Sequence, residues 1–192
     1  MSSQAIKQEA LNLFALHGYE GTSLADIAEQ VGIKKQSIYA HFKGKDDLFI
    51  QVLKETFADE IKREKEYLKA NASHTLKELL WESLQNFTSR FHHDNRLKFW
   101  LRNTSIPPYH LYNEVITYLY KYIDQVDQLY LDRFQHAFNE GEIEQDPAIA
   151  AMAYSSLVDA IGVELIYGDE MRTNRKLHAS WQIYWLGVTS AV

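Results

Sequence analysis

The sequence predicts an all-α protein of about nine helices, with a small three-helix head at the N-terminus followed by a helical bundle. Three observations lead to this prediction. Long stretches follow the helical period, no run alternates polar and apolar residues as a strand does, and only three prolines interrupt the chain. With 192 residues, 46% of them hydrophobic and 13% aromatic, the chain is long and apolar enough to bury a packed core.

The first two helices are predicted from an apolar stripe, a cap and two glycines. Residues 3–17 carry apolar side chains at helical spacing, and Gly18 is expected to end that helix. Ser23 and Asp26 then stand at the spacing of a capping box, at the start of a helix of about eight residues that ends at Gly32. A helix this short needs tertiary partners to persist.

A third short helix is predicted over residues 34–41, with Ile38 and Phe42 turned inward. Six further helices follow, over residues 45–70, 74–93, 96–104, 110–139, 148–167 and 174–190. We expect two domains: a small three-helix domain over residues 1–48, and a larger helical domain over residues 49–192.

The charge distribution is uneven. The chain has 26 Asp and Glu against 20 Lys and Arg, yet the stretch "QVGIKKQSIYAHFKGK", residues 30–45, holds four lysines and a histidine without one acidic residue. If Ile38 and Phe42 pack inward, the other faces of the third helix display Lys34, Lys35, Gln36, Ser37, Tyr39 and His41. Glutamine can pair with an adenine edge, and the other side chains can reach phosphates or base acceptors.

Lys45 opens the next helix, where free amides and the helix dipole also favour a phosphate. Asp46 and Asp47 lie in the first turn of the same helix, where carboxylates offset its positive end, so we expect a structural role for them. A short run of lysines is often only solvated surface. Together with two short helices and a glycine turn, however, this run favours a helix-turn-helix that binds DNA.

Residues 18–49, "GYEGTSLADIAEQVGIKKQSIYAHFKGKDDLF", resemble the DNA-binding domain of the TetR family of bacterial transcriptional regulators. The resemblance is carried by a tyrosine–x–histidine–phenylalanine signature, by a lysine three residues later, and by apolar and glycine positions before it. The matching residues are Gly18, Thr22, Ile27, Ala28, Val31, Gly32, Ile38, Tyr39, His41, Phe42, Lys45 and Leu48.

The resemblance implies roles for individual residues. Tyr39 and Lys45 are expected to hold operator phosphates, and Thr22 or Ser23 to help at the first helix of the motif. The residues expected near base edges are Lys35, Gln36, Ser37 and Ala40. Lys34 departs from the family, which often has Ser or Thr there as a helix cap, because a lysine cannot accept the capping hydrogen bond.

The resemblance also implies that the last two helices form a two-fold dimer. Residues 148–167 are apolar or small around nearly the whole helix, as expected of a helix buried on more than one side. Burial deep inside a monomer would produce the same pattern. The candidate dimer contacts are Met152, Leu157, Ile161, Trp181, Tyr184, Trp185 and Val188.

A small-molecule effector is the other partner that the resemblance implies. Aromatic residues crowd the middle of the chain, and an excess of tyrosine there favours an apolar or aromatic ligand, although most of the stripe at helical spacing is typical of core. Pro107-Pro108 breaks the chain where the mouth of a pocket could form. The candidate ligand contacts are Phe87, Phe91, Trp100, Tyr109, Tyr112 and Tyr118.

Several other classes are less consistent with the sequence. There is no cysteine, no signal-peptide pattern and no run of about 18 uninterrupted apolar residues, so we expect a cytoplasmic protein without a membrane span. No enzyme motif occurs, and we expect no cofactor and no metal; adjacent His92 and His93 point about 100° apart on a helix. An all-α enzyme, or an adaptor whose basic face binds an acidic protein, remains the alternative.

Overall fold

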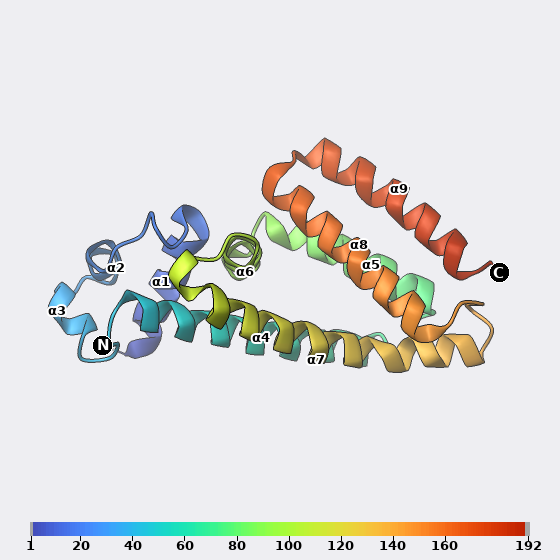
Figure 1. The fold of residues 1–192 in the computed structure, drawn as a ribbon, viewed down its shortest axis with the longest axis horizontal. Helices are drawn as coiled ribbons and strands as arrows, with labels where there is room; N and C mark the ends of the chain where they lie inside the picture. Colours follow the sequence, from blue (N-terminus) through green and yellow to red (C-terminus); the bar gives the residue numbers. More distant parts are fainter. Residues whose placement is uncertain (1, 191–192) are drawn as a thin grey trace. The chain divides into compact units, whose positions relative to one another are not determined.

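The computed structural model describes residues 2–190 and is mainly helical in that range (Figure 1). Nine α-helices, one 3-10 helix (η1) and no strand are found among these residues, which confirms the predicted fold class. The elements are α1 Ser3–His17, α2 Leu24–Val31, α3 Lys35–Ile38, α4 Lys45–Ala70, α5 Leu76–Phe91, α6 Asn95–Ser105, η1 Tyr109–Leu111, α7 Tyr112–Asn139, α8 Pro147–Tyr167 and α9 Glu170–Val188.

Contacts along the chain divide the molecule into two compact units. Unit 1 consists of Met1–Glu60 and His93–Lys121, and unit 2 of Ile61–His92 and Tyr122–Val192. The long helices α4 and α7 therefore contribute residues to both units. Unit 1 contains the predicted helix-turn-helix and also α6, η1 and the first part of α7.

Side-chain caps fix where most helices begin, and they explain why α5 and α9 start at other residues than predicted. Thr75 and Glu78 form a capping box, so α5 starts at residue 76 and not at 74. The Asp169 carboxylate accepts a hydrogen bond from the Arg172 amide at 2.7 Å, which starts α9 four residues earlier than predicted. The predicted capping box of Ser23 and Asp26 at α2 is confirmed.

The turn between α2 and α3 is closed by a glycine in the left-handed region. Gly32 has φ 73° and ψ 34°, and the Ile33 amide donates to the Ala28 carbonyl at 2.9 Å, as in a Schellman motif. The helix predicted over 34–41 is α-helical only from Lys35 to Ile38. The chain stays coiled beyond Ile38, because the His41 and Phe42 amides both donate to the Ile38 carbonyl.

The core of unit 1 is an aromatic cluster at the junction of α1, α4 and α6. The Phe49 ring lies 5.2 Å from that of Phe14 and 5.6 Å from that of Phe99, and all three side chains are fully buried. Arg102 of α6 reinforces this packing, since its guanidinium donates to the Ala15 carbonyl at 2.9 Å and also to the Leu16 carbonyl. Arg102 thereby satisfies carbonyls at the C-terminal end of α1.

Truncation of Phe49 to alanine should destabilise unit 1 strongly. The ring is fully buried, and removing a buried phenylalanine typically costs about 3–5 kcal/mol because a cavity remains. Urea unfolding followed by circular dichroism would measure the loss. Tyr120→Ala is the matched control, because 61% of this side chain is exposed and its removal should change stability by less than about 0.5 kcal/mol. Equal effects of the two variants would contradict the assignment of this core.

Unit 2 is built from α5, α8 and α9 together with parts of α4 and α7. Helices α8 and α9 run antiparallel and side by side (Figure 1). Leucines of α5, Phe134 of α7 and Tyr154 of α8 fill the core, and the Tyr154 hydroxyl donates to the Leu80 carbonyl at 3.0 Å. The Trp181 ring lies 5.4 Å from that of Trp81, which joins α9 to α5.

Helix α8 is the most apolar element of the described chain. Pro147–Tyr167 is long and apolar enough to cross a membrane by length and composition, with a mean hydropathy of 1.6 over 18 residues. The core helix of a soluble protein passes the same test, and one such helix is weak evidence for a membrane span. The side of α8 that includes Tyr154 and Ile161 is already buried within unit 2.

Candidate nucleic-acid interface

The residues of α3 divide cleanly between core and surface. Ile38 is fully buried and Phe42 is 2% exposed, so both anchor the helix as predicted. Seven polar or small residues around them are exposed, and Tyr39 keeps 54% of its surface accessible. The structure thus brings together on one exposed segment Lys34, Lys35, Gln36, Ser37, Tyr39, Ala40 and His41.

The lysines of this segment have no anionic partner in the described part of the chain. Neither Lys34 nor Lys35 forms an ion pair with any residue from 2 to 190, and residues 30–45 contain no carboxylate. Their ammonium groups are therefore free to bind phosphates of a nucleic acid. We call the exposed residues 34–37 and 39–41 the recognition segment.

The start of α3 lacks a side-chain cap, as predicted from the lysine at that position. Lys34 is the N-cap residue, with φ −76° and ψ 143°, and its side chain makes no capping hydrogen bond. Free amides at a helix start can be satisfied by water or by an anion. The start of α3 therefore has unsatisfied donors beside two lysines.

Replacing Lys34 by serine should stabilise the fold and weaken binding to DNA. A serine at the N-cap typically contributes about 1 kcal/mol, which raises Tm by about 2–4 °C in a chain of this size. The same change removes one cation from the recognition segment, so DNA affinity should fall. Thermal unfolding and a DNA titration measure the two effects. Unchanged Tm and unchanged affinity would refute this role of Lys34.

Thr22 and Ser23, predicted at the first helix of the motif, lie in different environments. Thr22 is 2% exposed, and its hydroxyl donates to the Gly18 carbonyl at 2.9 Å, so this side chain stabilises the turn after α1. Ser23 is exposed, and its Oγ accepts from the Ala25 and Asp26 amides at 3.2 Å. Because a hydroxyl that accepts can still donate, Ser23 retains a proton for a phosphate oxygen.

Both carboxylates at the start of α4 are used within the fold. The Asp46 carboxylate accepts from the Tyr19 hydroxyl, and this hydrogen bond is the main cause of the lowered pKa of Asp46. The Asp47 carboxylate accepts from the Gln51 amide group and from the Lys43 backbone amide, both at 2.8 Å, and its pKa is lowered as well. These contacts agree with a structural role.

Lys45 is also held by the fold. Its Nζ donates to the Tyr19 carbonyl at 3.0 Å and to the Thr22 carbonyl at 3.1 Å, and it lies 3.9 Å from the centre of the Tyr19 ring. Local sequence patterns do not indicate these contacts, because they join residues 23 and 26 positions apart. Local sequence patterns also do not indicate the contacts of His110 in η1. Its Nε2 lies 3.4 Å from both the Tyr19 hydroxyl and an Asp46 oxygen.

The six candidate ligand contacts are distributed over both units. Phe87 and Phe91 lie on α5 in unit 2, and both are half-buried. In unit 1, Tyr109 of η1 is 96% exposed and Tyr112 of α7 is 51% exposed. Trp100 of α6 and Tyr118 of α7, also in unit 1, are half-buried. Their role in effector binding stays a prediction.

Most candidate dimer contacts fill the core of unit 2. Tyr184 and Trp185 are half-buried, Met152 is 71% exposed, and four are buried: Leu157, Ile161, Trp181 and Val188. A different set of α8 side chains recurs every three or four residues on the exposed side, namely Ile149, Met152, Ser156, Ala160, Val163 and Tyr167. Exposed on α9 at the same spacing are Met171, Arg175, Ala179, Ile183 and Leu186.

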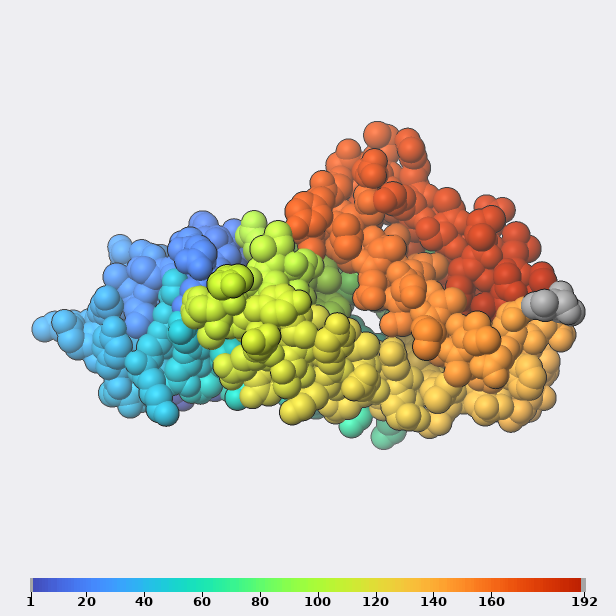
Figure 2. All heavy atoms as spheres, viewed as in Figure 1, coloured from blue at the N-terminus to red at the C-terminus, as the bar shows by residue number. Residues whose placement is uncertain are grey.

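We call the exposed α8 and α9 residues together the outer face. Atoms of both helices are at the surface of unit 2 in Figure 2. Because large apolar side chains such as Ile149, Met152 and Ile183 are 63–71% exposed on it, this face has the composition of an interaction surface.

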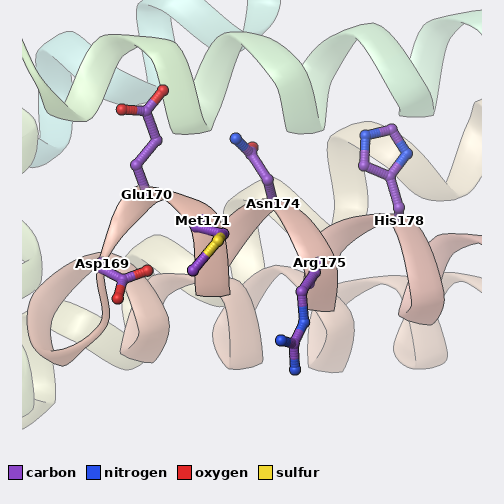
Figure 3. A pocket seen from close by; sticks show the side chains of 6 residues that line it. All are labelled: Asp169, Glu170, Met171, Asn174, Arg175 and His178. Carbon is purple, nitrogen blue, oxygen red and sulfur yellow. The ribbon is translucent and has the colours of Figure 1, made fainter.

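An open groove of about 780 Å³ lies at the start of α9 (Figure 3). Glu170, Asn174 and His178 point toward the neighbouring helix, which is α5, whereas Arg175 points away from it (Figure 3). The His178 ring lies 5.1 Å from that of Trp81 on α5. Among residues 2–190, no group of three or more His, Asp or Glu side chains could hold a metal ion.

The recognition segment lies within a region that matches a known family. Residues 6–52 match the family described as bacterial regulatory proteins, tetR family. The match covers about a quarter of the chain. The region includes most of α1, all of α2 and α3 and the start of α4, and therefore the whole recognition segment.

Two relatives and one solved structure extend the comparison. An uncharacterized HTH-type transcriptional regulator of Bacillus subtilis, YezE, is 27% identical over 150 residues, which cover 77% of this chain and 76% of YezE. The HTH-type transcriptional repressor ComR of Escherichia coli is 49% identical, but only over 49 residues, or 26% of this chain and 23% of ComR. The crystal structure of FadR from Bacillus subtilis, in complex with stearoyl-CoA, shares the fold over 100% of both chains, with 21% identity and a TM-score of 0.69.

Proposed function

We propose that the chain is a homodimeric transcriptional repressor that binds a palindromic operator and is released from it by a small apolar or aromatic molecule. The recognition segment is the observation that carries this proposal. It places unpaired lysines, a glutamine and a tyrosine on one short exposed segment of an otherwise acidic protein. A positive surface on a negative body directs a polyanion to that one segment.

Within this segment, the side chains divide into two kinds of contact. The phosphate backbone is contacted by Lys34, Tyr39 and His41, and also by Ser23 at the start of α2. These contacts set the register of the N-terminal helices on the duplex. Base edges are read in the major groove by Lys35, Gln36, Ser37 and Ala40, with Gln36 suited to adenine and the Ala40 methyl group to thymine. The DNA-binding function is thereby assigned to residues 1–48, and ligand binding and dimerisation to residues 49–192.

Dimerisation is proposed to occur through the outer face of α8 and α9. Two antiparallel helices from each of two subunits can form a four-helix interface with two-fold symmetry. This pairing would cover the exposed apolar side chains of α8 and would account for its high hydropathy without a membrane. Of the contacts predicted from the sequence, Met152 belongs to this face. The four buried ones lie in the core of unit 2, where they hold α8 and α9 in place.

The residues proposed to contact an effector are Phe87 and Phe91 in unit 2, and Trp100, Tyr109, Tyr112 and Tyr118 in unit 1. Support comes from FadR of Bacillus subtilis, whose structure contains stearoyl-CoA, an apolar ligand with a polar head. The effector acts by favouring one conformation of the dimer, so that operator affinity falls without contact between effector and DNA. We propose that the chain has no catalytic activity, binds no cofactor and is located in the cytoplasm.

A footprinting experiment tests the proposal. The full chain is incubated with DNA that flanks its own gene, and protection from nuclease is mapped at several salt concentrations. A protected palindrome with half-sites about one helical turn apart, lost steeply as salt rises, is expected. The footprint is then repeated with a panel of fatty acyl compounds, hydrophobic amines and aromatic acids. If no site is protected at low salt, either in the DNA that flanks the gene or in random genomic fragments, the proposed function is excluded.

A further inference from the structure

We propose that Glu164 is a positioning residue for dimerisation: its carboxylate holds the first two turns of α9 against the end of α8, so that the exposed stripes of the two helices form one continuous surface. The inference rests on the proposed dimerisation through the outer face and concerns what keeps that face in shape. Glu164 itself is buried and does not belong to the outer face.

The Glu164 carboxylate has two cationic partners on α9. Its side chain is only 9% exposed. The Arg172 guanidinium donates from Nε to one carboxylate oxygen at 2.7 Å, and the Lys176 ammonium group donates to the other oxygen. The hydrogen bonds from Lys176 and Arg172 lower the pKa of Glu164, so the carboxyl group is ionised at neutral pH. We call Glu164, Arg172 and Lys176 the hairpin clamp.

The backbone of Glu164 fastens the same end of the hairpin. Its carbonyl oxygen accepts from the Gly168 amide at 2.7 Å and from the Thr173 hydroxyl at 3.4 Å. A Cβ atom at Gly168 would lie 2.7 Å from this carbonyl oxygen and 2.9 Å from a carboxylate oxygen of Glu164, so a side chain does not fit there. The turn from α8 to α9 is therefore closed tightly around Glu164.

The hairpin clamp lies beside the outer face. Each of its three residues is next in the sequence to an exposed residue of that face. The outer-face residues at this end of the hairpin are Val163, Tyr167, Met171 and Arg175. At the opposite end, the Tyr184 hydroxyl of α9 donates to the Ala150 carbonyl of α8 at 3.0 Å. The two helices are thus joined by polar contacts at both ends, and the clamp aligns their stripes at the turn.

Loss of the carboxylate would release this end of α9. A glutamine at position 164 keeps the size of the side chain but has no charge and only one acceptor oxygen. Arg172 and Lys176 lie one turn apart, and without the shared carboxylate they would repel each other and the neighbouring Arg175. In a two-fold dimer the same displacement occurs in both subunits, so the fit of the interface is lost twice.

A double-mutant cycle on the full chain tests the clamp with Glu164→Gln, Lys176→Met and the two changes combined. Analytical ultracentrifugation over a range of chain concentrations measures the dimer Kd of each variant. For Glu164→Gln we expect the dimer Kd to rise at least about tenfold, because a nearly buried ion pair is broken. Lys176→Met should raise it less. The combined variant should match Glu164→Gln alone, because both changes remove the same interaction.

Two controls separate positioning from other effects. Glu66→Gln makes the same substitution elsewhere in unit 2, at a 3.9 Å ion pair with Lys62 whose side chains are 68–75% exposed, and should leave the dimer Kd unchanged. Phe49→Ala should lower Tm without changing the dimer Kd, because Phe49 lies in the core of unit 1. An unchanged dimer Kd in Glu164→Gln, or losses that simply add in the combined variant, would overturn the proposal.

Hydrogen exchange tests the clamp independently of the dimer. At chain concentrations below the dimer Kd, the amides of residues 170–177 should exchange faster in Glu164→Gln than in the wild type, while those of α5 exchange equally. Equal exchange of residues 170–177 in both proteins would refute the clamp. If the wild-type chain never dimerises, the proposed dimer fails, and the exchange rates still decide whether Glu164 holds the start of α9.

Discussion

The double variant Lys34→Glu/Lys35→Glu should lose at least about 100-fold in operator affinity without a fall in Tm. Each substitution replaces a cation proposed to lie at a phosphate or a base edge, and contacts of this kind contribute about 1–3 kcal/mol each. Both side chains are exposed and neither forms an ion pair in the described chain, so folding does not depend on them. Anisotropy titrations against the footprinted duplex measure the loss.

The matched control changes the net charge of the chain by the same amount elsewhere. Lys65 and Lys69 are both exposed on the part of α4 that belongs to unit 2. Lys65→Glu/Lys69→Glu should weaken binding only slightly, through the overall field of the protein. Equal losses in the two double variants would show that general charge, and not the recognition segment, governs binding.

Placing an arginine in the middle of the outer face should separate the dimer. Ala160 is an exposed small residue in the α8 stripe, between Ser156 and Val163. In Ala160→Arg a charged side chain would be buried at the proposed two-fold interface, which costs several kcal/mol. Sedimentation should then show a monomer, and operator affinity should fall at least about 100-fold, because one head alone contacts one half-site.

Phe138→Arg is the control for this prediction. Phe138 is an apolar residue of α7 with 42% of its surface exposed, and it is not part of the outer face. This variant should remain a dimer and bind the operator as the wild type does. A dimeric Ala160→Arg variant with normal affinity would contradict the assignment of the outer face.

The sequence was sufficient to predict most of the helices and the surface of α3. Helical periodicity identifies a buried side, and glycines and caps identify ends, so Ile38, Phe42 and Gly32 were assigned correctly. The start of α9 was missed because Asp169 was not recognised as a cap. The exposure of the recognition segment was predicted in full, since its residues are close together in the sequence and their exposure follows from the two apolar anchors.

Contacts between distant residues were not predictable in the same way. A helical pattern says which side of a helix is buried but not which element covers it. Arg102 and His110 contact α1 and the residues after it from 86 to 91 positions away, and nothing in their local sequence indicates this. Lys45 illustrates the consequence: its charge and its place at a helix start fit a phosphate contact, whereas its actual partners are two backbone carbonyls.

The stoichiometry of the complex with operator DNA tests the account most directly. Native mass spectrometry of the full chain with the footprinted palindrome should show two chains per duplex at low salt. With the Lys34→Glu/Lys35→Glu variant, the same measurement should show free DNA and free dimer. Wild-type protein that leaves every duplex unbound, or a double variant that still forms the two-chain complex, would contradict the claim that two recognition segments bind the operator.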